Sequence, residues 1–295
     1  MKQSVGSGLI KLVIVALALA GLSGCASPQT RTLIPEDSGD IAIKTIFFKL
    51  GMNRPLGSYE IKGSSIITGK TTKVSKGEAA FAGFGAMAAH SRGKEAAKKI
   101  VGKYEPILKY DLVSEVDSIV RDEAKKWRGR TRFSATISAV DNRVVELEPW
   151  VYLGASNDGK TGRVGVYLRA FLKDKSGKKI WRGGYNYQSP VKRPFEGANG
   201  WFANNGRNLK RTIRRGYRTV AGVMMKDSQG ARAGWGSEAV KMRVAIPGGQ
   251  ALAKLDAVIL KRSGSMIVYM PKVSKGAFIY GINVVPENEV EIIGK

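Results

Sequence analysis

A densely basic stretch carries the side chains of this sequence that are best suited to bind an anion. Its members are Arg207, Lys210, Arg211, Arg214, Arg215 and Arg218. A guanidinium group is planar, always charged, and able to make paired hydrogen bonds to a phosphate or a carboxylate. No acidic residue lies between Glu196 and Asp227. The stretch therefore predicts a binding surface for an anionic partner. The alternative is the solvated face of a generally basic protein.

The same stretch has the period of an amphipathic helix that runs from Asn204 or Asn205 to about Lys226. Either asparagine can cap the start of such a helix. Apolar residues recur three or four positions apart, which places them on one side of a helix and the basic residues on the other. The predicted apolar stripe consists of Leu209, Ile213, Tyr217, Val220 and Met224.

Motifs of catalytic, metal and cofactor sites are absent from the sequence. His90 is the only histidine, and without a second histidine or a nearby cysteine it makes a poor metal ligand. There is no phosphate-binding loop, and Gly83-Phe84-Gly85-Ala86 is only a fragment of a dinucleotide fingerprint. No Gly-x-Ser-x-Gly elbow is present. The sequence therefore predicts a protein with no catalytic residues, metal or cofactor. The alternative is an enzyme with an unrecognised site.

The N-terminal residues have the composition of an export signal. Lys2 and Lys11 supply positive charge, and residues 12–20 form an uninterrupted apolar run. A membrane-spanning helix needs about 20 apolar residues, so this run is too short to span and suits a cleaved signal peptide. An uncleaved anchor helix is the alternative.

The four residues that close this signal, Leu22-Ser23-Gly24-Cys25, resemble the lipobox of bacterial lipoproteins. The resemblance implies cleavage before Cys25, a diacylglycerol thioether on its sulfur, and an acylated N-terminus. Two or three acyl chains, such as palmitate, anchor a protein far more stably than one. Ala26 follows, where an aspartate marks inner-membrane retention in Gram-negative lipoproteins. The resemblance thus implies an outer-membrane protein that faces the periplasm in such a host. Cys25 is the only cysteine, so no disulfide supports the fold.

The charge balance points to an anionic environment. Lys and Arg total 49 against 24 acids, a formal net charge of +25, which favours anionic partners or surfaces. Export moves the expected partner away from nucleic acid, which is abundant in the cytoplasm. The expected candidates are lipid headgroups, lipopolysaccharide, a cell-wall polymer or an acidic protein.

The elements that must position the basic helix follow from periodicity. A second amphipathic helix is predicted over Pro106–Trp127, where its four acids (Asp111, Glu115, Asp117 and Asp122) are interpreted as solvated charges. Alternating patterns predict strands from Ile41 to Leu50, Phe133 to Val140 and Arg143 to Leu153, and a hairpin over Arg163–Gln188. Together these patterns predict an α+β fold: a two-layer sandwich of antiparallel sheet with helices on one face, plus a small C-terminal β module.

The predicted organisation divides the chain into five parts. They are a signal peptide (1–24), a lipidated tether (25–40), an α+β periplasmic domain (41–226), a linker (227–238) and a small β-rich module (239–295).

The hairpin that turns through Asp174-Lys175-Ser176-Gly177-Lys178-Lys179-Ile180-Trp181 resembles periplasmic lipoproteins with a small α/β sandwich, such as the curli secretion lipoprotein and the penicillin-binding-protein activators. This resemblance covers about 25 residues and carries over no functional residue. The predicted function is a non-catalytic, lipid-anchored envelope protein that binds or scaffolds an anionic partner. The alternative is a multimeric secretion or pore component, a homo-oligomer with the small-residue segment 79–90 at the membrane.

Overall fold

The computed structural model describes residues 41–47, 58–61, 66–70, 82–128, 133–134, 143–156, 159–174, 176–228, 235–245, 252–272 and 281–294. The predicted signal peptide, the lipobox with Cys25, and the tether lie outside the described residues. The same holds for residues 48–50 and 135–140 of two predicted strands, residues 79–81, and residues 229–234 of the predicted linker.

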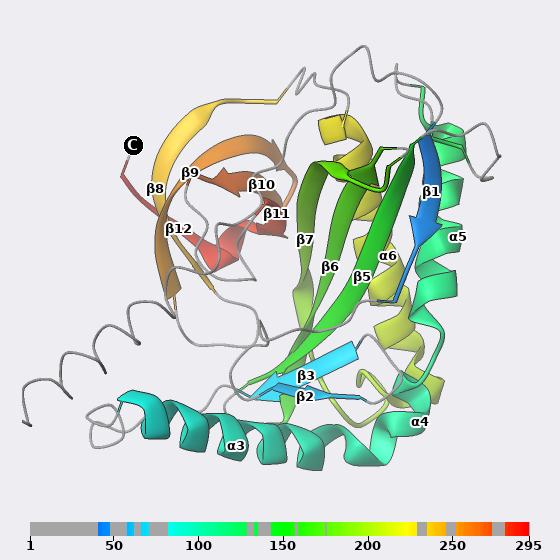
Figure 1. Cartoon of the computed structure of the whole chain (residues 1–295). Helices are drawn as coiled ribbons and strands as arrows, with labels where there is room; N and C mark the ends of the chain where they lie inside the picture. Colours follow the sequence, from blue (N-terminus) through cyan, green and yellow to red (C-terminus); the bar gives the residue numbers. More distant parts are fainter. Residues whose placement is uncertain are drawn as a thin grey trace, which may run out of the picture.

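The chain has an α+β fold, as the sequence predicts, in which one large mixed sheet forms the body of the described structure (Figure 1). Its long central strands are β5 (Val144–Ala155), β6 (Thr161–Lys173) and β7 (Lys179–Pro194). These three strands pair antiparallel, so that Val166 of β6 lies opposite Val151 on one side and Tyr187 on the other.

The β6–β7 hairpin confirms the alternating pattern of the sequence. Val164, Val166, Leu168, Ala170 and Leu172 are all buried in the main core. The turn is closed by Asp174, whose carboxylate accepts hydrogen bonds from the backbone N–H groups of Ser176 and Lys178, both at 2.9 Å. The Ser176 hydroxyl, which also bonds to this carboxylate, is the main cause that lowers the pKa of Asp174.

The first strands join the sheet through parallel pairings. β1 (Ile41–Thr45) lies between β5 and the short β4 (Phe133–Ser134), parallel to both. β3 (Ile66–Lys70) also runs parallel to β5, farther along that strand, and pairs with β2 (Ser58–Glu60). The sequence predicts strands at β1, β4 and β5 but not their parallel pairings, because β1 lies far from β4 and β5 in the chain.

The C-terminal strands extend the same sheet past β7. β11 (Ile282–Pro286) runs parallel to β7 and is followed in the sheet by β10, β9, β8 and β12, which curl into a partly closed unit (Figure 1). The bounds of those strands are Met266–Pro271 (β10), Leu252–Ser263 (β9), Glu238–Ala245 (β8) and Val290–Gly294 (β12), with a 3₁₀ turn, η3 (Glu287–Glu289), before β12. A separate apolar cluster that includes Met242, Ile259 and Tyr269 fills the curl.

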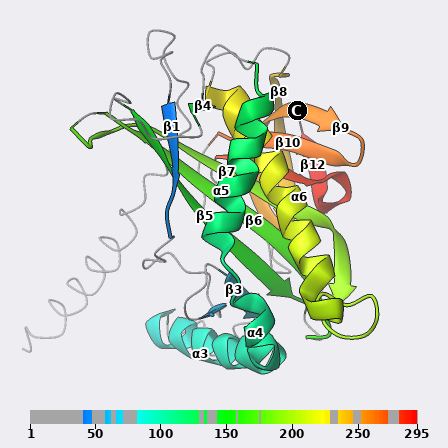
Figure 2. The ribbon, with the colours of Figure 1, turned by 90° about the vertical axis from the view of Figure 1, so that its right-hand side faces the viewer.

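The helices form the second layer. α5 (Leu112–Lys126) and α6 (Ala203–Ser228) lie side by side across one face of the central strands, and α3 (Ala82–Val101) lies beside β2 and β3 (Figure 2). A 3₁₀ turn, η2 (Gly102–Tyr104), and the single-turn helix α4 (Glu105–Leu108) connect α3 to α5. None of the helices in the described part of the chain is both long and apolar enough to cross a membrane.

The helix predicted over Pro106–Trp127 is interrupted. α4 ends at Leu108, and α5 begins again at Leu112 after Asp111, whose carboxylate accepts a hydrogen bond from the Ser114 N–H at 3.0 Å. This capping bond satisfies a backbone donor that a helix start otherwise leaves unpaired. The apolar stripe on which this prediction rests is largely confirmed, since Leu108 of α4 and Leu112, Val116, Ile119, Val120 and Ala124 of α5 are buried, while Trp127 at the end of the stripe is only partly buried.

α6 packs against the sheet at a glycine. A Cβ atom at Gly216 would lie 2.7 Å from Cγ2 of Val166 and 2.9 Å from Cδ1 of Tyr187. We therefore expect Gly216→Ala to destabilise the protein by about 1–3 kcal/mol, because overpacking outweighs the better helix propensity of alanine. The matched control is Gly222→Ala on the same helix, where a Cβ would meet nothing within 4 Å, so this variant should be neutral or stabilised by up to about 1 kcal/mol. Urea unfolding measures both, and equal effects would contradict this packing.

Candidate functional site: the basic face of α6

The apolar stripe predicted for the basic helix is confirmed. Leu209, Ile213, Tyr217, Val220 and Met224 are all buried, each at 1 % exposure or less. They face the central strands, which turns the basic residues outward. The Tyr217 hydroxyl donates a hydrogen bond to the Trp150 carbonyl oxygen at 2.9 Å, so the helix is fixed to β5 by a polar contact as well as by packing.

The start of α6 differs from the predicted asparagine cap. Asn204, Asn205 and Gly206 all have positive φ angles, of 48°, 54° and 72°, so the regular helix begins after them. Asparagine and glycine are the residues that adopt this left-handed conformation most readily. Gly206 is also sterically required, because a Cβ there would lie 2.5 Å from Cγ2 of Ile107 in α4. The chain thus turns sharply into α6 against the neighbouring helix.

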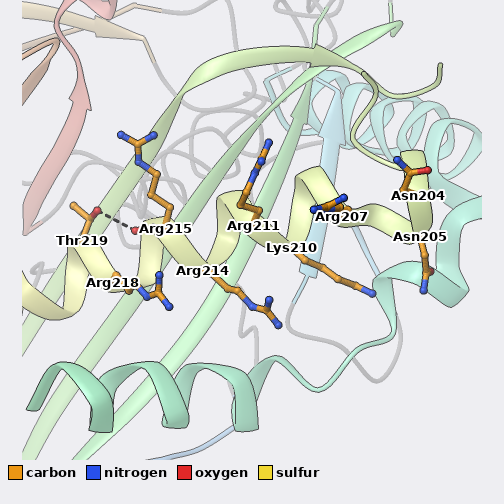
Figure 3. Close-up of a pocket in the computed structure, with 9 residues that line it drawn as sticks. All are labelled: Asn204, Asn205, Arg207, Lys210, Arg211, Arg214, Arg215, Arg218 and Thr219. Carbon is orange, nitrogen blue, oxygen red and sulfur yellow. Dashed lines mark hydrogen bonds between the residues drawn. The ribbon is translucent and has the colours of Figure 1, made fainter. Parts of the chain in front are cut away.

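All six predicted binding residues lie on the outward face of α6 (Figure 3). With Asn204, Asn205 and Thr219 they line a hollow of about 790 Å³ between their extended side chains. Arg211 and Arg215 point to one side of the helix axis, while Lys210, Arg214 and Arg218 point to the other (Figure 3). We call this hollow the basic trough.

One arginine of the trough is engaged by the neighbouring helix. Nε of Arg214 lies 2.5 Å from Oε1 of Glu115 in α5, and its Nη2 lies 3.2 Å from Oε2. The hydrogen bond to Glu115 raises the pKa of Arg214 above its ordinary value. The Arg214 side chain is 53 % exposed, and such half-exposed pairs contribute only about 0–1 kcal/mol to stability. Arg214 therefore mainly joins α5 to α6.

The trough also has an aromatic neighbour. Nζ of Lys210 lies 5.8 Å from the ring centroid of Tyr110, within the range of a cation–π contact. Burial raises the pKa of Tyr110 above its ordinary value, so the phenol stays neutral. Its buried hydroxyl has no hydrogen-bond partner among the described residues. Tyr110 therefore contacts Lys210 through its aromatic ring and adds no negative charge to the trough.

The remaining cations of the trough are exposed and lack acidic partners within the described structure. Arg211 donates a hydrogen bond to the Asn208 side chain at 3.1 Å, and Arg207, Arg215 and Arg218 have no ion pair with any described acid. Two unit charges about 6 Å apart repel by about 0.7 kcal/mol even in water. Closely spaced cations of this kind therefore favour binding of an anion, which would relieve their repulsion.

Three of the four acids of the predicted second helix make specific contacts, which corrects their interpretation as solvated charges. Asp111 caps α5, and its hydrogen bonds to Ser114 lower its pKa. Glu115 binds Arg214. Asp117 accepts hydrogen bonds from Arg121 at 2.5 Å and from the Thr45 hydroxyl of β1 at 2.9 Å, so it links α5 to β1. Asp122 alone has the expected character, an exposed pair with Lys125.

Besides the Tyr217 hydrogen bond, a second polar contact joins α6 to the sheet at the C-terminal end of the helix. Asp227 and Ser228, which the sequence places at the start of the linker, are buried residues of the last turn of the helix. The Asp227 carboxylate accepts a hydrogen bond from the Tyr185 hydroxyl of β7 at 2.9 Å. Periodicity carries no signal for this contact, because Tyr185 lies 42 residues before Asp227 in the sequence.

Other candidate residues are not brought into a site. His90 lies in α3, and its side chain is outside the described part of that helix. In the described ranges, no three or more His, Cys, Asp or Glu side chains gather in a group that could hold a metal ion. In comparisons with known proteins, no family model matches this chain, and no curated protein matches it in sequence.

Proposed function

We propose that this chain is a lipid-anchored protein of the bacterial cell envelope that binds an anionic partner through the basic trough and has no catalytic role. The observation that carries the binding proposal is the set of exposed arginines on one face of a packed helix. Arg207, Arg215 and Arg218 have no acidic partner in the described structure. Because the opposite face of α6 is fully buried, these cations can serve a ligand without disturbing the fold.

Support for the anchor comes from the residues Leu22-Ser23-Gly24-Cys25, which follow a short apolar signal core. Lipid on Cys25 would hold the protein at a membrane surface, and in a Gram-negative host the residue after Cys25 favours the outer membrane. The tether of about 15 residues would leave the folded part within reach of lipid headgroups, lipopolysaccharide phosphates and cell-wall polymers. All of these are rich in anions.

The experiment that tests both halves of the proposal is salt-dependent fractionation of the Cys25→Ala variant. We expect the wild type to stay in the envelope fraction at every salt concentration, because its attachment is hydrophobic. The variant should remain partly bound at low salt through the trough and be released at high salt, since exposed charges are screened over about 3 Å at 1 M. Mass spectrometry of the N-terminal peptide checks lipidation. An unmodified Cys25 in the wild type would refute the anchor, and a variant that is soluble at low salt would refute anionic binding.

A further inference from the structure

The basic trough consists of two rows of side chains with different surroundings. Residues four apart on a helix are neighbours, so Arg207, Arg211 and Arg215 form one row, which we call the outer row. Lys210, Arg214 and Arg218 form the inner row, on the side of Arg214 that meets Glu115 of α5 (Figure 3). The inner row is partly occupied by its contacts with Glu115 and Tyr110. The outer row, which makes no contact with Glu115 or Tyr110, is therefore the better candidate to bind a ligand.

The outer row is regularly spaced along the helix axis. A helix rises 1.5 Å per residue, so its members follow one another at intervals of about 6 Å. From Arg207 to Arg218 the two rows extend over about 16 Å. The trough, at about 790 Å³, is far larger than one phosphate group and is comparable in volume to the site of a ligand with several such groups. A ligand with several anionic groups in a line therefore fits better than a single small anion.

The apolar side chains argue against a membrane surface as the ligand. A helix that lies in a membrane interface inserts large apolar residues from the face it presents to the lipid. In α6 the large apolar residues are turned into the core, and the exposed large hydrophobic residues of the described structure are Phe47, Val191 and Ile292, none of them on α6. The residues that line the trough are all polar or charged.

The lining also argues against single-stranded nucleic acid. Proteins that bind such strands without sequence preference stack the bases on aromatic side chains, and the trough lining contains no aromatic residue. Five of its cations are arginines, whose forks match the paired oxygens of a phosphate. We infer that the basic trough binds a linear polymer of phosphodiesters without bases, held chiefly by the outer row. This inference rests on the proposed anionic binding.

The test is a titration of the full chain with Cys25→Ala, which has no lipid, against base-free phosphodiester oligomers of increasing length. Affinity should rise by at least about ten-fold from a single phosphodiester to an oligomer that spans the trough, through effective concentration, and then level off. Each of Arg207→Gln, Arg211→Gln and Arg215→Gln should lower the slope of log affinity against log salt by about 0.7. Arg214→Gln should change that slope least of the trough arginines, because Glu115 already engages its guanidinium.

Two further probes separate the outcomes. They are vesicles of phosphatidylglycerol in phosphatidylcholine, and polyglutamate of matched charge. Tight binding of the oligomers with the expected length dependence supports the inference. If vesicles or polyglutamate bind at least as tightly as the longest oligomer, the phosphodiester assignment is overturned while anionic binding stands. Absence of binding to all three probes at low salt would overturn both. Slopes that are unchanged in the outer-row variants would overturn the assignment of that row.

Discussion

Val116→Asp is expected to unfold the main body of the protein. Val116 is 0 % exposed and lies in the core between α5 and the sheet. A carboxylate placed there without a partner costs several kcal/mol, more than about 4 kcal/mol in the severe cases. Because domains are stable by only about 5–15 kcal/mol, most of the stability should be lost. Circular dichroism during urea unfolding measures the change.

The control for this substitution introduces the same side chain two positions away. Ser118 is exposed on α5, so Ser118→Asp should change the free energy of unfolding by no more than about 0.5 kcal/mol. Equal losses of stability in the two variants would show that the buried face of α5 is assigned incorrectly. Asp117→Ala is not a neutral control, because its carboxylate binds both Arg121 and Thr45.

Local patterns were sufficient to predict the helix that carries the site and the hairpin beneath it. The β6–β7 hairpin follows from the alternating residues of β6 and the turn at Asp174, and α6 follows from an apolar stripe in which every predicted member is buried. In both cases the residues that determine the structure are close in sequence, so their period identifies the buried face. The positions of the six basic residues on the outward face follow from the same period.

Contacts between segments that are distant in sequence could not be predicted from periodicity. Nothing in the pattern of β11 indicates that it pairs parallel with β7, or that β1 lies between β4 and β5. The roles of Glu115 and Asp227 depend on which helix or strand lies opposite, and an isolated acid in a sequence resembles any solvated charge. The two rows of the trough are therefore visible only once α5 is placed beside α6.

The proposed function places anion binding at the basic trough rather than in the high net charge of the protein as a whole. Changing Arg207, Arg211 and Arg215 together to Glu reverses the outer row, replacing three attractive contacts with three repulsive ones. These side chains are exposed, so the thermal midpoint should move little, or rise as the repulsion between cations is relieved. Affinity for an anionic polymer at low salt should fall by at least about 100-fold.

The most direct measurement compares this triple variant with one of identical net charge. Lys241, Lys254 and Lys272 are exposed on or beside the C-terminal strands β8–β10, and changing them to Glu alters the net charge by the same amount. In a low-salt titration of both variants with a base-free phosphodiester polymer, the α6 variant should lose at least about 100-fold in affinity and the lysine variant less than about three-fold. Equal losses in the two variants would mean that binding follows total charge, and would contradict a binding site on α6.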